Sequence, residues 1–480
     1  MIIKRASFNN FFVALLLIIG SILFLETDLG NDYSAWIGRM GLIVIVWCGI
    51  SLYQYTGRWF TLVYMFEVSF YIFTLGQSLL CGLGVENGKY NQYAREAVVD
   101  VNTAYVFTIL CLITLHIGIL WYINRKNNKL EYLKKETNLE LRKYESKYSG
   151  IMKSVGWVFF AISIVPYIFE SYKLLRAYSI SGYAAAFSSI SGTTSWSKAF
   201  SLIADFFPFI LFMLYIVYIE DRVVKKCLAL LIFLVTIYNL AIGNRCEPIC
   251  YIMAYLWLNN KMALSKSQER RTTIIAICAV LFLMLIIPVI GATRNTGELS
   301  VNTVLSSLVG EDSFISTIFE TISNLGYSVF PTIKTMQIVP NTEGYHWGQS
   351  YLYALLSVFP NVFGGTHISV KYAALAQWLM KTLGMTYGPG YSMPAEAYYN
   401  FGWAGILAMP IIGCIISKLL YENDKNLTDL KLFSIVGAFI VLFSIPRRDT
   451  LTAVRELAYY VGLLYLIVYL LKRWKGKDSI

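Results

Sequence analysis

Apolar residues run along the sequence in continuous stretches rather than in alternation. About twelve stretches approach the roughly 20 residues that a helix needs to cross a hydrocarbon core. Continuous runs predict helices, because lipid offers no hydrogen-bond partner to an open strand. The sequence therefore predicts an all-α polytopic membrane protein with spans near residues 8–25, 36–55, 59–83, 103–123, 154–172, 200–219, 227–242, 248–258, 272–292, 402–420, 432–445 and 452–471.

The composition agrees with this reading and excludes several classes of protein. Hydrophobic residues make up 57% of the 480 positions and charged residues only 14%, whereas a soluble domain carries about 25% charged residues. Fibrous, disordered and ordinary cytosolic classes are excluded. The net charge is +11, but the chain lacks the dense basic face of a nucleic-acid binder, so no nucleic-acid partner is expected.

The distribution of Lys and Arg predicts the orientation of the spans. Lys4 and Arg5 precede the first span, and placing them in the cytoplasm collects the basic excess on that side once the spans alternate. The largest cytoplasmic segment, 124–153, holds nine basic and four acidic residues, and we expect a solvated, partly helical loop that touches anionic membrane lipids. We expect residues 1–480 to form a single integral membrane domain with both termini cytoplasmic and no cleaved signal.

One external segment, 293–401, is too long to be a mere connector. Within it, residues 314–333 and 351–362 are apolar enough to form amphipathic or re-entrant helices, punctuated by Pro331, Pro340 and Pro360. Long ordered loops on a rigid scaffold often carry binding sites. We therefore expect this segment to roof a water-facing cavity at the outer leaflet.

Several arginines stand near span ends on the outer side, where the charge rule predicts few. They are Arg245, Arg294, Arg447, Arg448 and Arg455. A planar guanidinium binds phosphate oxygens in a bidentate way and stays charged when partly buried. Gathered together, these side chains would make a phosphate site; otherwise each snorkels to the interface or pairs with a carboxylate nearby.

The start of the last span strengthens the phosphate interpretation. Arg448 and Arg455 are seven residues apart, which places them on one face of a helix. Asp449 and Thr450 are suitable N-cap residues for that helix. Its N-terminus would then point outward beside the arginines, with the positive end of its dipole toward a phosphate.

Acid and base candidates lie in the same external segment. Glu396 follows a turn-rich stretch and suits either proton acceptance from a sugar hydroxyl or capping of a helix. His346 stands between Tyr345 and Trp347, where it would stack on or hydrogen-bond a sugar, or serve the structure alone. His367 is a weaker candidate of the same kind.

Other ionisable residues suggest structural roles. Glu67, Asp205 and His116 fall inside predicted spans, and we interpret them as helix–helix contacts. The eight cysteines form no metal-binding motif, and no acidic metal-binding motif stands in the external segments. No cofactor and no metal site are expected.

Three features resemble the Wzy family of O-antigen or oligosaccharide repeat-unit polymerases. They are Arg294 just after a span, the Tyr-x-x-Gly-x-Ser-Tyr pattern at 345–351 followed by Phe359-Pro360, and the Glu-x-Tyr-x-Asn-Phe-Gly-x-x-Gly pattern at 396–405. The resemblance covers roughly residues 243–456. An Arg-x10-Gly pattern of some members is absent, since Leu256 and Leu305 stand eleven residues after Arg245 and Arg294, so catalytic assignments from those members do not carry over.

The resemblance implies glycosyl transfer at the outer face of the bacterial cytoplasmic membrane. A growing glycan on undecaprenyl pyrophosphate would pass to the non-reducing-end hydroxyl of an incoming lipid-linked repeat unit. A chain-length regulator and a flippase are then candidate partners. In that scheme Arg294, Arg447 and Arg448 bind the pyrophosphate with Arg245 and Arg455 nearby.

The same scheme assigns the remaining candidates. Glu396 is the first choice of base and His346 the second, and Tyr345, Tyr391 and Asn400 bind substrate.

Two other functions fit parts of the sequence. An O-antigen ligase shares the donor and the leaving group but uses another acceptor, and the sequence hardly separates it from a polymerase. A lipid-linked oligosaccharide flippase would show two similar halves with short loops. Here the halves are unlike and one external loop dominates, which disfavours transport.

Overall fold

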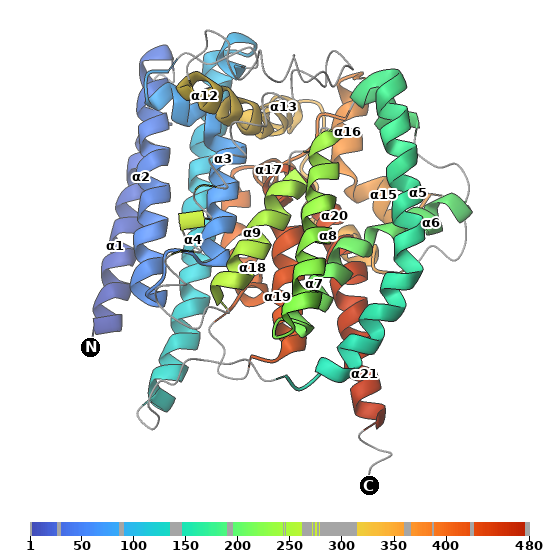
Figure 1. Cartoon of the computed structure of the whole chain (residues 1–480). Helices are drawn as coiled ribbons and strands as arrows, with labels where there is room; N and C mark the ends of the chain where they lie inside the picture. The colour runs from blue at the N-terminus through green and yellow to red at the C-terminus, as the bar shows by residue number, and fades with distance from the viewer. Residues whose placement is uncertain are drawn as a thin grey trace. The chain divides into compact units, whose positions relative to one another are not determined.

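The computed structural model describes most of the chain, and its regular elements there are all helices (Figure 1). The described residues are 2–25, 30–85, 91–134, 146–189, 195–242, 244, 246–261, 271, 274–275, 278, 314–359, 366–385, 388–422 and 427–475. The prediction of an all-helical fold is confirmed over these residues.

Eight helices in the described part of the chain are long and apolar enough to cross a membrane. They are Tyr33–Thr56, Leu62–Gly82, Val98–Asn127, Ser149–Ala177, Ala199–Val217, Arg222–Ala241, Asp429–Arg447 and Thr450–Lys475. The chain is therefore a multi-pass membrane protein. A ninth crossing results if Met393–Leu407 and Met409–Leu419, which are bent by 92°, form one span. The predicted total of about twelve is too high for the described residues.

The predicted span at 402–420 has other bounds in the structure, and it is bent. The apolar helix begins at Met393 rather than at Gly402, and it bends by 92° before Met409. Gly402 has a φ of +58°, and Pro410 lies in the first turn of the second helix. Gly402 ends α17 with a positive φ that an α-helix does not use, and Pro410 stands where a proline suits the start of a new helix.

Three other predicted spans do not appear among the eight. For the predicted span at 8–25, the apolar stretch found among the described residues, Asn9–Leu23, is shorter than a span. The one at 248–258 is the helix α9 (Cys246–Lys261), only 16 residues long, with Glu247 in its first turn and Lys261 in its last. The run at 272–292 lies outside the described residues except for a few positions.

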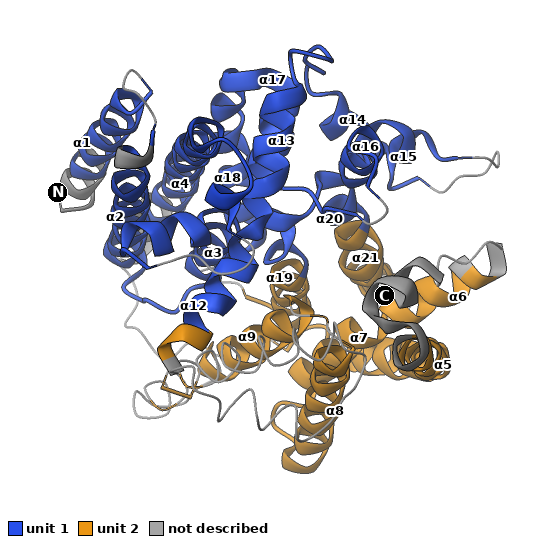
Figure 2. Cartoon of the chain, turned by 90° about the horizontal axis from the view of Figure 1, so that it is seen from above, with its two compact units in different colours: residues 1–140, 318–421, 441–455 blue, residues 141–317, 422–440, 456–480 orange. Residues whose placement is uncertain are grey.

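The chain divides into two compact units, coloured separately in Figure 2. Unit 1 comprises residues 1–140, 318–421 and 441–455, and unit 2 comprises 141–317, 422–440 and 456–480. The helices lying wholly or mostly in unit 1 are α1 (Ile2–Leu23), α2 (Asn31–Thr56), α3 (Leu62–Gly82), α4 (Val98–Lys134), α12 (Phe314–Leu325), α13 (Phe330–Ile338), α14 (Gln349–Leu356), α15 (Ile368–Ala373), α16 (Leu375–Thr382), α17 (Met393–Phe401), α18 (Met409–Leu419) and α20 (Thr450–Glu456), with the 3₁₀ turns η1 (Gln92–Ala94), η2 (Gly326–Val329), η3 (Gly402–Leu407) and η4 (Ile445–Arg447).

Unit 2 holds a second group of helices. They are α5 (Ser149–Ser189), α6 (Ser195–Asp205), α7 (Phe207–Val217), α8 (Arg222–Ala241), α9, most of α19 (Asp429–Leu442), the π-helical stretch η5 (Leu457–Leu463) and α21 (Leu464–Lys475). Tyr460 of η5 donates a hydrogen bond to Asp205 of α6 at 2.9 Å. The interpretation of Asp205 as a helix–helix contact is confirmed.

In unit 1, α2, α3 and α4 lie side by side, and α4 packs closely on α18 (Figure 1). The close approach depends on two glycines. A Cβ on Gly118 of α4 would overlap the main-chain carbonyl of Pro410, and a Cβ on Gly413 of α18 would overlap that of Leu115. Small residues let membrane helices bring their backbones together.

A buried polar bridge connects α2, α3 and α4. His116 Nδ1 lies 2.6 Å from Glu67 Oε1, and His116 Nε2 lies 2.6 Å from Ser51 Oγ. All three side chains are fully buried. Glu67 and His116 therefore join helices, as we interpreted them from the sequence, and the structure supplies the partners that the sequence did not show.

The described part of segment 293–401, which we predicted to be external, is largely helical. Residues predicted as a helix at 314–333 form α12, η2 and the start of α13, with Pro331 in the first turn of α13. The second predicted helix is α14, which ends at Leu356; Pro360 lies outside the described residues. Of these helices, α13 and α14 pack against α17, which carries the principal acidic candidate.

Candidate functional site

The helix α17 is set by its N-terminal residues. Ser392 has an extended backbone, and its hydroxyl accepts a hydrogen bond from the main-chain N–H of Ala395 at 3.4 Å. The same hydroxyl lies 3.0 Å from Thr332 Oγ1 of α13. Pro394 follows in the first turn, where its missing N–H costs nothing. The helix is buried from Met393 to Asn400.

Glu396 lies inside this buried helix, and only 1% of its surface is exposed. Its Oε1 accepts a hydrogen bond from Ser350 Oγ at 2.6 Å. Its Oε2 accepts one from the main-chain N–H of Thr450, the first residue of α20, at 2.8 Å. Of the two roles expected for Glu396, the structure shows the helix cap, although the capped helix is α20 rather than its own.

Asn400 completes the network one helical turn further along α17. Its Nδ2 donates to Ser350 Oγ and to the Glu396 main-chain carbonyl, both at 2.8 Å. Ser350 thus accepts from Asn400 and donates to Glu396. Asn400 is fully buried, so its side chain organises the site from within.

The N-terminus of α20 is occupied by two carboxylates. Asp449 Oδ1 accepts from the main-chain N–H of Thr452 at 3.1 Å and from its hydroxyl at 2.6 Å. The prediction that Asp449 caps this helix is confirmed. Glu396 accepts from the N–H of Thr450, and Asp449 accepts from the N–H of Thr452. These two amides are therefore not available to a phosphate, and the positive end of the helix dipole faces the two carboxylates instead.

Arg447 and Arg448 form the turn that leads into α20. Arg447 ends η4, and its guanidinium stands over the Phe73 ring of α3 at 5.5 Å from the ring centroid. Arg448 has an extended backbone, with φ −133° and ψ 168°. Both side chains are partly buried. The turn is fixed because Glu396 bonds to the amide two residues after Arg448.

Arg455 is also partly buried and lies in the last turn of α20. The argument that Arg448 and Arg455 share one helical face is wrong, because Arg448 precedes the helix in an extended conformation. Arg245 and Arg294 lie outside the described residues.

His346 and Tyr345 lie in the turn 343–348, which is hydrogen-bonded to the end of α17. The N–H of His346 donates to the carbonyl of Tyr399 at 3.3 Å, and the N–H of Trp347 donates to that of Asn400 at 2.8 Å. The His346 ring stacks on the Tyr399 ring, with centroids 3.9 Å apart and planes 7° from parallel. His346 and the Glu396 network are thereby attached to the same helix.

The two predicted tyrosines occupy different environments. Tyr391 is only 1% exposed, and its hydroxyl donates to Thr335 Oγ1 at 3.1 Å, since Thr335 itself donates to the Pro331 carbonyl. Tyr345 is partly buried and covers Gly402, where a Cβ would meet its ring. Tyr345 is therefore better placed to meet a substrate than Tyr391.

The family model described as O-antigen polysaccharide polymerase Wzy matches residues 8–478. The chain belongs to this family. The match covers both units and every predicted site residue. The chain has no match among the curated proteins or among the solved structures that were compared with it. Membership in the Wzy family makes the chain an enzyme of glycan polymerisation whose substrates are lipid-linked repeat units.

The sequence did not select Ser350 or Glu343 for this candidate site, and it selected Thr450 only as a helix cap. Ser350 and Thr450 hold the Glu396 carboxylate from 46 and 54 residues away. Glu343 stands beside His346, with 3.6 Å between its Oε2 and His346 Nε2. Ser350 lies in the 345–351 pattern that resembles the family, so the sequence did contain a signal for it. The contact of Glu396 with the Thr450 main-chain amide has no local sequence signal, because every residue except proline carries such an amide.

Tyr351, next to Ser350, carries a buried hydroxyl for which the described residues offer no hydrogen-bond partner. Burial raises the pKa of Tyr351 well above its ordinary value, and the nearby Glu396 carboxyl raises it further. A raised pKa favours the neutral form of this phenol.

Among the described residues, Cys48, Glu67 and His116 form the group with atoms suited to a metal ion, all within 4.8 Å of one another and fully buried. The contacts of 2.6 Å from His116 to Glu67 and to Ser51 are hydrogen-bond distances. Two ligands on one zinc ion stand farther apart, at about 3.3 Å for bonds of ~2.0 Å. The hydrogen-bonded bridge accounts for this group.

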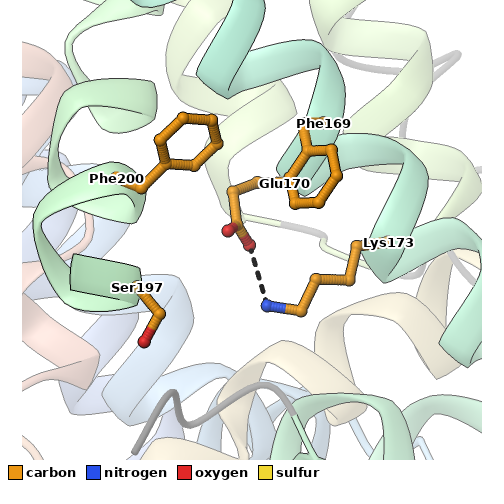
Figure 3. Close-up of a pocket in the computed structure, with 5 residues that line it drawn as sticks. All are labelled: Phe169, Glu170, Lys173, Ser197 and Phe200. Carbon is orange, nitrogen blue, oxygen red and sulfur yellow. Dashed lines mark hydrogen bonds and ion pairs between the residues drawn. The ribbon is translucent and has the colours of Figure 1, made fainter. Parts of the chain in front are cut away.

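Unit 2 contains a cavity of about 520 Å³ between α5 and α6. Figure 3 shows its lining: Phe169, Glu170 and Lys173 from α5, with Ser197 and Phe200 from α6. Lys173 and Glu170 pair at 3.4 Å. The walls are largely apolar and the two charges neutralise each other, and none of the described site residues predicted for the Wzy reaction lines this cavity.

Proposed function

We propose that the chain extends a surface polysaccharide by whole repeat units at the outer face of the bacterial cytoplasmic membrane. The donor is the growing glycan on undecaprenyl pyrophosphate, and the acceptor is the non-reducing-end hydroxyl of an incoming lipid-linked repeat unit. The acceptor oxygen attacks the anomeric carbon of the donor, the bond from that carbon to the pyrophosphate breaks, and the hydroxyl proton passes to a base. The family match over residues 8–478 is the observation that carries this proposal.

The leaving pyrophosphate requires cationic stabilisation, which we assign to the arginines. Departure of the lipid pyrophosphate exposes negative charge, and fixed guanidinium groups stabilise such charge best where water is scarce. Arg447 and Arg448 support this role because they are adjacent, partly buried and held on a braced turn. From their places in the sequence, Arg294, Arg245 and Arg455 are proposed to assist. Arginines at the leaving group make the transfer independent of a divalent metal.

The base is the second assignment, and the geometry favours His346 over Glu396. Both carboxylate oxygens of Glu396 are engaged, and the residue is 1% exposed, so an incoming hydroxyl would have to displace Ser350 or the α20 amide. His346 keeps 24% of its side chain exposed, and its Nε2, although buried, has no hydrogen-bond partner among the described residues and stands 3.6 Å from the Glu343 carboxylate. We therefore propose His346 as the base and Glu396 as a positioning residue that fixes the turn with Arg447 and Arg448.

The phosphate assignment is tested with alanine variants in a strain lacking its own polymerase. Arg448→Ala and Arg294→Ala should abolish long-chain polysaccharide while membrane protein levels stay normal. Arg58→Ala is the control, because Arg58 is an exposed arginine in the turn after α2. Full-length polysaccharide from both site variants would remove the arginines from the mechanism.

A further inference from the structure

Trp347 is displayed at the surface of the chain in an unusual way. It is 79% exposed, and with a φ of +49° it is the one described non-glycine residue with a positive φ. L-residues other than glycine rarely adopt this conformation, because the side chain crowds the backbone there. The backbone is held there because the Trp347 N–H bonds to the Asn400 carbonyl and Gly348, also left-handed, follows. The indole is thus displayed by a fixed turn.

A carboxylate is fixed in the same turn. Trp378 of α16 donates its indole N–H toward both oxygens of Glu343, at 3.1 and 3.3 Å. The Glu343 side chain remains 38% exposed. A carboxylate has about four acceptor positions, so this one keeps acceptor positions for further donors.

His346 supplies a third group between these two. Its ring is immobilised by stacking on Tyr399, and Trp378 packs against the same tyrosine with centroids 4.7 Å apart. Its Nε2 is buried without a hydrogen bond within the described chain, so it has capacity to bond a ligand that enters beside Glu343. The turn therefore combines an aromatic face, a carboxylate and an imidazole within six residues.

These three groups match the chemistry of a sugar. A pyranose ring offers a face of C–H groups that packs on an aromatic ring, and its neighbouring hydroxyls donate to carboxylates and bond to imidazole. We propose that Glu343, His346 and Trp347 form a sugar-binding subsite for the acceptor repeat unit, an inference that rests on the proposed function. Asn400 links the subsite to the site's interior, because its carbonyl holds Trp347 and its side chain holds Ser350.

The test measures sugar binding without requiring transfer. The repeat-unit oligosaccharide is released from its lipid by mild acid and titrated against the purified full chain in detergent, with binding followed by saturation-transfer NMR. Trp347→Ala should weaken binding about tenfold, the factor that corresponds to about 1.4 kcal/mol of lost contact. Trp347→Phe should retain most of the affinity because it keeps an aromatic face, and Glu343→Gln should weaken binding severalfold.

The control is Trp474→Ala, which removes a similarly exposed tryptophan (67%) from α21. Wild-type affinity in Trp347→Ala, at an unchanged thermal midpoint, would overturn the subsite and leave Trp347 as an anchor at the membrane interface. Absence of binding by the wild-type chain would overturn it as well. Because the assay needs no donor, its failure is distinguishable from a failure of the polymerase assignment, which depends on the Arg448→Ala and Arg294→Ala result.

Discussion

At the residue scale, Glu396 organises the candidate site through its hydrogen bonds. One carboxylate oxygen holds α14 through Ser350, and the other holds the start of α20 through the Thr450 amide. This arrangement fixes the arginine turn without any contact to solvent. Hydrogen bonds to a buried carboxylate contribute more than those between neutral groups, so its removal leaves two donors unsatisfied.

Two substitutions separate positioning from catalysis by Glu396. Glu396→Gln keeps an oxygen for the Thr450 amide, and we expect it to retain polymer formation with a loss of about 1 kcal/mol in the free energy of unfolding. Glu396→Ala leaves the Thr450 N–H and the Ser350 O–H without their acceptors, and it should cost about 2–4 kcal/mol and most of the polymer. Polysaccharide gels and thermal unfolding measure both effects.

The opposite pattern would restore Glu396 as the base. A Gln side chain cannot take a proton from a hydroxyl, so a fully folded Glu396→Gln chain without polymer would contradict the positioning role. His346→Gln serves as the companion variant, and it should lose polymer while unfolding at the wild-type temperature.

At the element scale, the sequence predicts most spans but not how they break or join. Continuous apolar runs are sufficient to locate the eight spanning helices. The sequence does not predict the 92° bend before Met409, because the run stays apolar across it. The sequence does not predict the contacts of Glu396 either, because Ser350 and Thr450 are distant from it in sequence and only the packing of the helices brings them together.

The bridge between α2, α3 and α4 provides a prediction at this scale. Removing one partner of a buried charged or strongly hydrogen-bonded pair costs about 3–5 kcal/mol, because the other stays buried and unpaired. Glu67→Leu and His116→Leu should each lower the free energy of unfolding by about that amount. The double variant should lose much less than their sum.

The measurement is a double-mutant cycle from denaturant unfolding of the purified protein in detergent. Ser51→Ala is the milder comparison and should cost about 1 kcal/mol, because it removes a single hydroxyl. Additive losses in the double variant would mean that Glu67 and His116 do not act as a pair.

At the scale of the whole molecule, the candidate site is formed by α14 and α17 together with residues 447–450, which precede or begin α20. From the sequence we predict that the basic excess orients the spans and that the arginines of the site lie on the outer side. Membership in the Wzy family agrees with a multi-pass membrane enzyme. The family's reaction is what separates this chain from a ligase, which would need an acceptor other than a second lipid-linked unit.

The most direct test supplies the purified chain, in liposomes, with the lipid-linked repeat unit as its only substrate. The account predicts a ladder of glycans that grows by whole repeat units and is absent with Arg448→Ala. A ligase or a flippase would leave the repeat unit at its starting length. A wild-type preparation that is folded yet yields no product longer than one unit would contradict the proposed polymerase function.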